Sequence, residues 1–182
     1  MELQLYKRKL NLPYNSLIYE YLIDCHFQNL KEDAKYKDAY YNFLVSDKKF
    51  FDFFDTLYEQ FYQQSVKIFG QLTLMPDNRR SCWIQVSNKY DIGGKQLIHN
   101  HIQSSIINGV YYFCVPEKNT GKIVFCDRYE NIISKYQPSE NTLLIFPNYL
   151  NHYPEVCDSE LFRIAINMEI LCEEDVWMTK TY

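Results

Sequence analysis

The sequence has 182 residues, of which 47% are hydrophobic and 17% aromatic, and its formal net charge is −4. A chain of this length suits one domain with a substantial core, and so apolar a composition excludes global disorder. A chain with a net negative charge has no positive electrostatic field to attract a phosphate backbone, so strong binding to duplex nucleic acid is not expected.

The first residues and the cysteines bear on the cellular compartment. Met1 to Leu10 is rich in charge and lacks an apolar signal core, and no later apolar run has the length of a membrane span. The six cysteines are scattered without a Cys-x-x-Cys pair, which favours small core residues over zinc or redox chemistry. We therefore expect a cytoplasmic protein with no membrane association.

Two helices are expected in the first part of the chain. Apolar residues recur at helical spacing from Ser16 to Leu30. A second helix follows a cap at Ser46 or Asp47 and ends at Gly70. Its apolar stripe, which is typical of a face packed on a core, consists of Phe50, Phe54, Leu57, Phe61 and Val66. Residues 1–70 are therefore expected to form a mainly helical support.

After Gly70 the pattern changes to short runs of β-branched and aromatic residues separated by turn residues, which is typical of strands. The expected strands are Gln71 to Leu74, Ser81 to Ser87, Gln96 to His101, Ser105 to Val115, Lys122 to Cys126, Thr142 to Phe146 and Phe162 to Leu171. Gly93-Gly94 and Pro116 to Gly121 are natural breaks. Short strands at this spacing, preceded by helices, predict an α+β protein with a jelly-roll-like core.

Three of the four histidines, His99, His101 and His152, fall in this strand-rich part. His99 and His101 are two apart in an expected strand, so their side chains should project from one face. His152 follows the strand Thr142 to Phe146 across a tight bend, where a third ligand can converge. Imidazole suits Fe, Zn, Cu or Ni, and three ligands on one side leave positions open for substrate and oxygen. Polar residues at strand ends explain the same pattern equally well.

Arg163 is the only cation in the apolar run Leu161 to Met168. A buried charge needs an anionic partner, and a guanidinium suits a ligand carboxylate because it binds it through two parallel hydrogen bonds. A salt bridge to a nearby Asp or Glu, or an outward position, is the more common case. Considered alone, Arg163 indicates an anion site without establishing one.

The chemistry-bearing segments form an ordered set between residues 82 and 167. They are Cys82 to Val86, His99-Asn100-His101, Ile107 to Tyr112, Gly121 to Phe125, Leu144 to Pro147, His152 and Arg163 to Asn167. This set resembles the iron and 2-oxoglutarate-dependent oxygenases, in particular a prolyl-hydroxylase-like group found in bacteria and phages. The ordered set is far more specific than any of its pieces.

The resemblance implies that residues 1–182 are a single domain, in which 71–182 form a double-stranded β-helix (a cupin-like jelly roll) and the N-terminal helices pack on one sheet. It implies Fe(II) held by His99, His152 and the residue two after His99, which is His101. Most of the superfamily has an acid at that third position, and three neutral imidazoles leave both charges of the iron uncompensated. A hydrogen-bonding role beside the metal is the alternative for His101.

Arg163 is similar to the family arginine that binds the distal carboxylate of 2-oxoglutarate. By the same similarity Tyr112 would hydrogen-bond that carboxylate, with Tyr111 as the second choice. Ala165 stands where many relatives have Ser or Thr, so one contact to this cosubstrate is expected to be missing. The implied activity is hydroxylation of a small-molecule or peptidyl substrate, with succinate and CO2 as co-products and ascorbate as a stimulating reductant.

Two other functions compete with this interpretation. The His99-x-His101 pair, and Pro147 followed by His152, also resemble the two cupin motifs, although the cupin glutamate is missing. A cupin would be a metal-dependent dioxygenase or isomerase without 2-oxoglutarate, which gives Arg163 no role. A non-catalytic jelly-roll binding protein would hold no iron at all. Neither the substrate nor the oligomeric state follows from the sequence.

Overall fold

The computed structural model describes residues 5–12, 16–31, 38–41, 48–70, 81–90, 96–103 and 105–171. Its helices are α1 (Ser16–Lys31) and α2 (Lys48–Phe69). Its strands are β1 (Tyr6–Lys9), β2 (Asp38–Tyr41), β3 (Ser81–Ser87), β4 (Ser105–Cys114), β5 (Ile123–Cys126), β6 (Ile132–Tyr136), β7 (Thr142–Pro147), β8 (Asn151–Pro154) and β9 (Arg163–Leu171). Within these ranges no helix combines the length and hydropathy that a membrane crossing needs.

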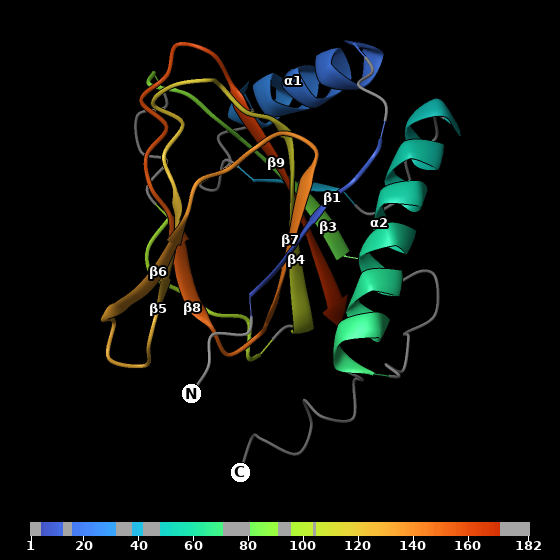
Figure 1. Cartoon of the computed structure of the whole chain (residues 1–182). Coiled ribbons are helices and arrows are strands. Elements are labelled where there is room, and N and C mark those ends of the chain that lie inside the picture. The colour runs from blue at the N-terminus through green and yellow to red at the C-terminus, as the bar shows by residue number, and fades with distance from the viewer. Residues whose placement is uncertain are drawn as a thin grey trace.

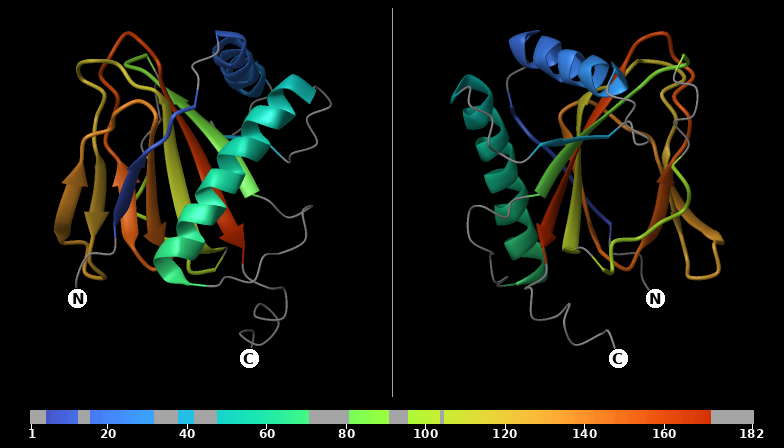
Figure 2. Two further views of the ribbon diagram at one scale, coloured as in Figure 1. Left: turned by 45° about the vertical axis from the view of Figure 1, so that its right-hand side comes forward. Right: turned by 180° about the vertical axis from the view of Figure 1, so that it is seen from behind.

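The strands form two antiparallel sheets. The larger sheet has six strands in the order β1-β7-β4-β9-β3-β2, and the smaller one has three in the order β6-β5-β8. Both helices lie on one side of the larger sheet and the smaller sheet lies on its other side (Figures 1 and 2). The described chain is therefore an α+β protein in three layers, with the larger sheet in the middle.

Strand β9 shows how the alternation of a strand creates two different interiors. Its residues Ile164, Ile166, Met168 and Ile170 are buried in the core between the larger sheet and the helices. Its Ala165 belongs instead to the core between the two sheets, together with Val110, Ile123 and Phe146. Because successive side chains point to opposite faces, Arg163, Asn167 and Glu169 also face the smaller sheet.

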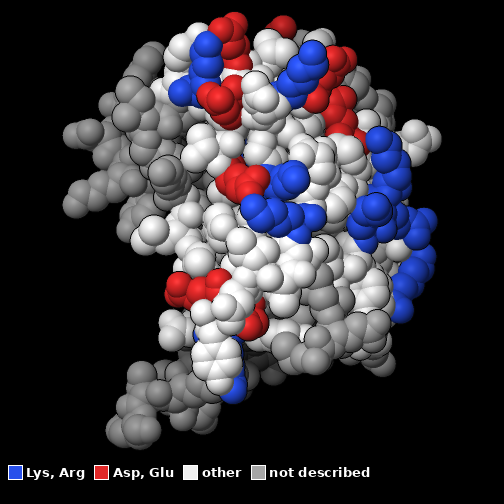
Figure 3. All heavy atoms as spheres, turned by 60° about the vertical axis from the view of Figure 1, so that its left-hand side comes forward, with Lys and Arg blue, Asp and Glu red and all other residues white. Residues whose placement is uncertain are grey.

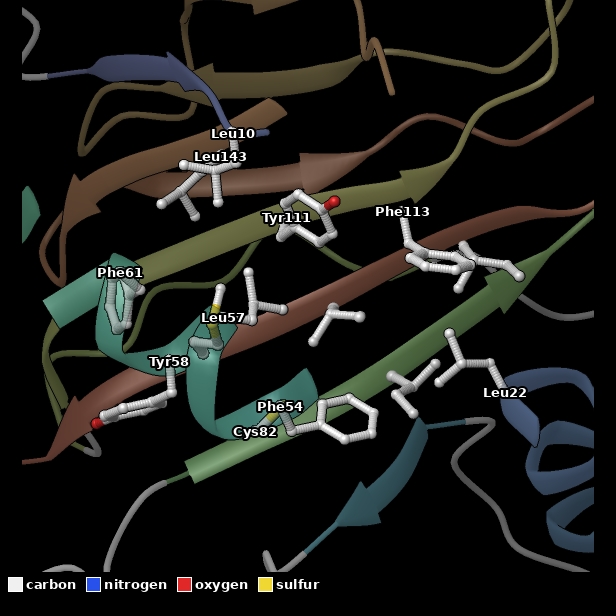
Figure 4. Close-up of a cluster of buried hydrophobic side chains, with 14 of the residues drawn as sticks. Leu10, Leu22, Phe54, Leu57, Tyr58, Phe61, Cys82, Tyr111, Phe113 and Leu143 are labelled. Carbon is white, nitrogen blue, oxygen red and sulfur yellow. The ribbon is translucent and has the colours of Figure 1, made fainter. Parts of the chain in front are cut away.

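Helix α2 packs its apolar stripe on the larger sheet. Figure 4 shows Phe54, Leu57 and Phe61 of this helix over the strands, and all three are buried. Phe61 needs Gly109 of β4 beneath it, because a Cβ at that glycine would lie 2.6 Å from the Phe61 ring. Three residues of the expected stripe therefore form a core face, whereas Val66 is only partly buried and the side chain of Phe50 lies outside the described part of the chain.

Strand β1 is an edge strand, and all four of its residues, Tyr6 to Lys9, are exposed. Basic side chains on an edge discourage pairing with another chain. Arg8 also connects this edge to α2, because its Nη1 donates to Gln64 Oε1 at 2.9 Å.

On the face drawn in Figure 3 the basic side chains gather along one side, and acidic side chains lie among them elsewhere. That face therefore carries both signs of charge.

Most of the expected elements are confirmed, namely both helices and the strands that correspond to β3, β4, β5, β7 and β9. The expected strand from Gln96 to His101 is wrong. Only His99 pairs, in an isolated bridge with His152, and the chain then turns so that Ser105 N donates to His101 O. The expected strand Gln71 to Leu74 lies outside the described residues. Strands β1, β2, β6 and β8 were not expected, because each is short and lacks a long apolar alternation.

Candidate metal centre

A cavity between the two sheets collects most of the residues that the sequence singled out. It is lined by His99, His101, His152, Arg163 and Tyr112. The rest of its lining includes Trp83, Gln85, Gln96, Asn108, Val110, Ile123, Phe146, Pro154, Ala165 and Asn167. Histidines and an arginine that are far apart in the sequence thus share one interior.

The three histidines converge in this cavity. Their ring nitrogens include three candidate ligand atoms that all lie within 4.8 Å of one another. The ring centroids are 4.4 Å apart for His99 and His152, 5.1 Å for His99 and His101, and 5.2 Å for His101 and His152. Three imidazoles at this spacing match the donor set of a transition-metal site.

Backbone pairing explains the convergence. The N–H of His99 donates to His152 O at 3.1 Å, and the N–H of His152 donates to His99 O at 2.8 Å, so the two rings lie opposite each other. His101 is placed by the turn that follows, where its N–H donates to Asn148 O at 2.9 Å. The sequence therefore predicted the convergence of the His-x-His pair correctly, although a turn produces it and not a strand.

Each imidazole is oriented by a hydrogen bond at Nδ1. Nδ1 of His99 donates to Leu97 O at 2.8 Å, and Nδ1 of His152 donates to Leu150 O at 2.9 Å. A carbonyl oxygen only accepts, so in these two rings Nδ1 carries the proton and the Nε2 lone pair is available to a metal. In the third ring, His101 Nδ1 lies 2.7 Å from a carboxylate oxygen of Glu169.

Electrostatics keep the two backbone-anchored imidazoles neutral. Burial lowers the pKa of His152 to about 3, and the neighbouring charge of His99 adds to this effect. Burial likewise lowers the pKa of His99. Only a neutral imidazole can ligate a metal, so both rings are ready to bind a cation at neutral pH without losing a proton.

Arg163 is a buried cation that lines the same cavity and is 4% exposed. Its Nη1 donates to Thr120 O at 2.6 Å and to Glu155 O at 3.3 Å. Among the described residues no carboxylate lies within ion-pair distance of it, and its Nε and Nη2 have no partner. The guanidinium is therefore anchored through one nitrogen, while the edge that can grip a carboxylate with two hydrogen bonds stays available.

The two tyrosines of β4 lie on opposite faces of the sheet. Tyr112 is buried and lines the cavity; burial raises its pKa, and the charge of Arg163 opposes that rise. Tyr111 packs in the helix-side core, as Figure 4 shows, and its hydroxyl donates to Asn141 Oδ1 at 2.6 Å. Burial raises the pKa of Tyr111 to about 12. The structure therefore brings Tyr112 to the site and does not bring Tyr111 there.

Two buried polar residues near the histidines were missed in the sequence. Glu169 contacts His101, and Asn108 lines the cavity with its Oδ1 bound to Ser105 Oγ at 2.8 Å. Asn108 Nδ2 is buried without a hydrogen-bond partner in the described part of the chain, so it can donate to a bound ligand. The sequence does contain a signal for Glu169, because this acid stands in an apolar strand six residues after Arg163 and therefore on the same face.

Solved structures of similar architecture bear on the fold. A prolyl-4-hydroxylase from Pseudomonas putida matches with a TM-score of 0.64 and 10% identity, over 93% of this chain and 94% of that one. A prolyl hydroxylase from Trichoplax adhaerens, solved with a hypoxia inducible factor oxygen degradation domain peptide fragment, matches with a TM-score of 0.66 and 13% identity, over 98% and 87%. The non-heme alpha ketoglutarate dependent carbocyclase SnoK from nogalamycin biosynthesis gives 0.65 and 11%, over 93% and 80%.

The chain shares the fold of these proteins. At identities this low the likeness is one of fold alone. The sequence itself matches no protein-family model and no curated protein. The chemistry of this chain must therefore be argued from its own site.

Proposed function

We propose that the protein is an Fe(II)- and 2-oxoglutarate-dependent oxygenase. The observation that supports this most strongly is the pairing, in one cavity, of a three-histidine cluster with a buried arginine that has no carboxylate partner among the described residues. The histidine cluster suits a metal ion, and the arginine suits a carboxylate of a ligand that also binds the metal. A dicarboxylic keto acid has both groups, a keto acid to chelate the metal and a second carboxylate to pair with the guanidinium.

The architecture agrees with this function. We propose that the two facing sheets form a double-stranded β-helix, with the helices as an outer support and the whole chain 1–182 as one domain. The similar structures include prolyl hydroxylases and a carbocyclase described as alpha ketoglutarate dependent. In the proposed domain, residues 71–182 carry the site, while residues 1–70 supply α1, α2 and two strands of the larger sheet.

The residues at the histidine end would hold the iron. His99, His101 and His152 would each bind Fe(II) through Nε2, because their Nδ1 atoms are engaged with oxygens. Three ligands on one side leave the other side open for 2-oxoglutarate and oxygen. When bound, Fe(II) and 2-oxoglutarate supply the oxidising chemistry, in which O2 converts 2-oxoglutarate to succinate and CO2 and hydroxylates a substrate.

The residues at the other end would position the cosubstrate. Arg163 would grip the distal carboxylate of 2-oxoglutarate through Nε and Nη2, and Tyr112 would donate a hydrogen bond to the same group. Val110, Ile123 and Ala165 give the cavity an apolar wall, which would exclude water from around the bound cosubstrate. This arrangement would direct the keto acid end toward the histidines, and burial would strengthen each polar contact.

The competing cupin interpretation differs in one respect that can be measured. A three-histidine site also suits a metal-dependent dioxygenase or isomerase that needs no 2-oxoglutarate. Such an enzyme gives no role to Arg163, whose buried charge would then remain uncompensated within the described residues. The dependence of turnover on 2-oxoglutarate therefore separates the two functions.

Succinate formation tests the proposal. The anaerobically purified protein should be given Fe(II), 2-oxoglutarate, ascorbate and O2, with prolyl peptides and free metabolites as candidate substrates. We expect succinate above background that requires both iron and an intact His152, and more of it when a true substrate is present. Oxygen consumption without succinate would favour the cupin interpretation.

A further inference from the structure

Glu169 is a buried acid beside the proposed metal centre. It lies on the cavity face of β9, and its side chain is only 6% exposed. One of its carboxylate oxygens lies 2.7 Å from Nδ1 of His101, whose side chain is 13% exposed. A contact this short between two buried groups is a charge-assisted hydrogen bond when Nδ1 carries the proton.

His101 is distinct from the other two histidines in this respect. His99 and His152 are held by neutral backbone carbonyls. Only His101 is held by a charged group. An imidazole that donates to a carboxylate is a stronger base at Nε2, and its orientation is fixed more firmly.

Glu169 lies close to the metal centre without belonging to its donor set. The group of ligand atoms that approach within 4.8 Å of one another contains the three histidines and not Glu169. Glu169 therefore contacts the donor set through the imidazole of His101. The charge it contributes is the charge that an acidic third ligand would have provided directly.

The backbone that carries Glu169 is anchored. The hydroxyl of Tyr58, from helix α2, donates to Glu169 O at 2.8 Å. On either side along β9, Met168 and Ile170 are buried in the helix-side core. The strand cannot turn its faces without exposing these apolar side chains, so Glu169 stays on the cavity face of β9.

We propose that Glu169 is a positioning residue of the metal centre: it holds His101 in the tautomer with Nε2 free for the metal, and the His101–Glu169 pair replaces the acidic ligand of related oxygenases. The inference rests on the proposed function, because it assumes that the histidines bind a metal. It adds a fourth residue to the site and explains how a three-histidine set can carry a negative charge near the iron.

Two substitutions separate the hydrogen bond from the charge. Glu169→Gln keeps an oxygen that can accept from Nδ1 and removes the charge, whereas Glu169→Leu removes both. Residues that support a ligand typically change metal affinity by about ten- to a hundredfold. We therefore expect Fe(II) affinity to fall about tenfold in the Gln variant and about a hundredfold in the Leu variant. Glu160→Gln, which removes an exposed acid paired with Lys89, is the matched control and should leave the affinity unchanged.

Co(II) substitution provides a readout that is independent of turnover. Each coordinated imidazole with a protonated Nδ1 gives an exchangeable, paramagnetically shifted proton signal. We expect three such signals in the parent protein, of which the one from His101 shifts in Glu169→Gln and is lost to rapid exchange in Glu169→Leu. The signals of His99 and His152 should persist, because their backbone acceptors are intact.

A double-mutant cycle completes the test. In a His101→Asp background Glu169 has no imidazole to support, so Glu169→Gln should cost much less Fe(II) affinity than in the parent. An equal loss in both backgrounds, or parent-like affinity and an unchanged His101 signal in folded Glu169→Gln and Glu169→Leu, overturns the inference about Glu169 alone. Failure of the parent protein to bind Fe(II) or Co(II) instead overturns the proposed function, and the inference with it.

Discussion

Replacement of Arg163 by leucine should weaken 2-oxoglutarate binding and leave iron binding intact. Arg163 is 4% exposed, and its Nη1 is occupied by the carbonyls of Thr120 and Glu155. The remaining edge can therefore form two parallel hydrogen bonds to a carboxylate. The histidine cluster is formed by other strands and turns, so the substitution does not touch it.

The size of the effect follows from this geometry. A hydrogen bond to a charged group contributes about 1.5 to 3 kcal/mol, and a bidentate pair loses part of its gain to desolvation. We therefore expect a loss of about 2 to 4 kcal/mol, which corresponds to about 30- to 700-fold in the dissociation constant. Arg163→Lys keeps the charge without the planar fork, so it should restore only part of the affinity.

Calorimetric titration of 2-oxoglutarate into the anaerobic Fe(II) protein measures this loss. Lys135→Met removes an exposed cation that pairs with Glu155 and serves as the matched control, with an unchanged dissociation constant. Tyr112→Phe should give a smaller loss than Arg163→Leu, because it removes one neutral donor. If Arg163→Leu is folded and binds 2-oxoglutarate as tightly as the parent, the assigned role of this arginine is wrong.

Four further predictions concern the histidines and the core. His152→Ala should lose most of the bound iron, measured by metal analysis after anaerobic purification. Burial lowers the pKa of His152 to about 3, so below about pH 6 the unfolded chain binds a proton that the folded metal-free protein does not. The free energy of unfolding should therefore fall on acidification by up to about 1.4 kcal/mol per pH unit. In denaturant titrations, His152→Ala should reduce this dependence on pH. His101→Ala should lower iron affinity substantially and His101→Asp should restore it, whereas no recovery in the Asp variant would indicate a supporting role for His101. Gly109→Ala should destabilise the fold by about 1 to 3 kcal/mol, because its Cβ would lie 2.6 Å from the buried ring of Phe61; an unchanged melting temperature would contradict this packing.

The local alternation of the sequence predicted the long elements and, apart from β5, missed the strands of four or five residues. Strands such as Ser81–Ser87 and Arg163–Leu171 have enough alternating or continuous apolar residues to be recognised. Strand Tyr6–Lys9 is formed mainly of charged residues, and it exists because it pairs with β7 far along the chain. Strand Asn151–Pro154 is equally short, and its pairing partner β5 determines it. Pairing between distant segments is a tertiary property that a local pattern does not contain.

The candidate site shows the same division between local and distant information. The two-residue spacing of His99 and His101 was visible, whereas the bridge that sets His99 against His152 depends on tertiary pairing. The resemblance favours Tyr112 over Tyr111, but the strand pattern alone does not decide between them, because adjacent residues of a strand point to opposite faces and only the packing of the layers shows which face is the cavity. Glu169 was overlooked because its partner, His101, is 68 positions away in the sequence.

We propose that one cavity of the protein binds Fe(II) and 2-oxoglutarate together. An anaerobic titration of 2-oxoglutarate into the Fe(II)-loaded protein, followed by visible absorption, tests this directly. Chelation of the iron by the keto acid should produce a charge-transfer band that saturates at one 2-oxoglutarate per chain and is missing without iron and in His152→Ala. An iron-loaded protein that shows no band and no heat of binding would contradict the claim, as would 2-oxoglutarate binding that is equally tight without the metal.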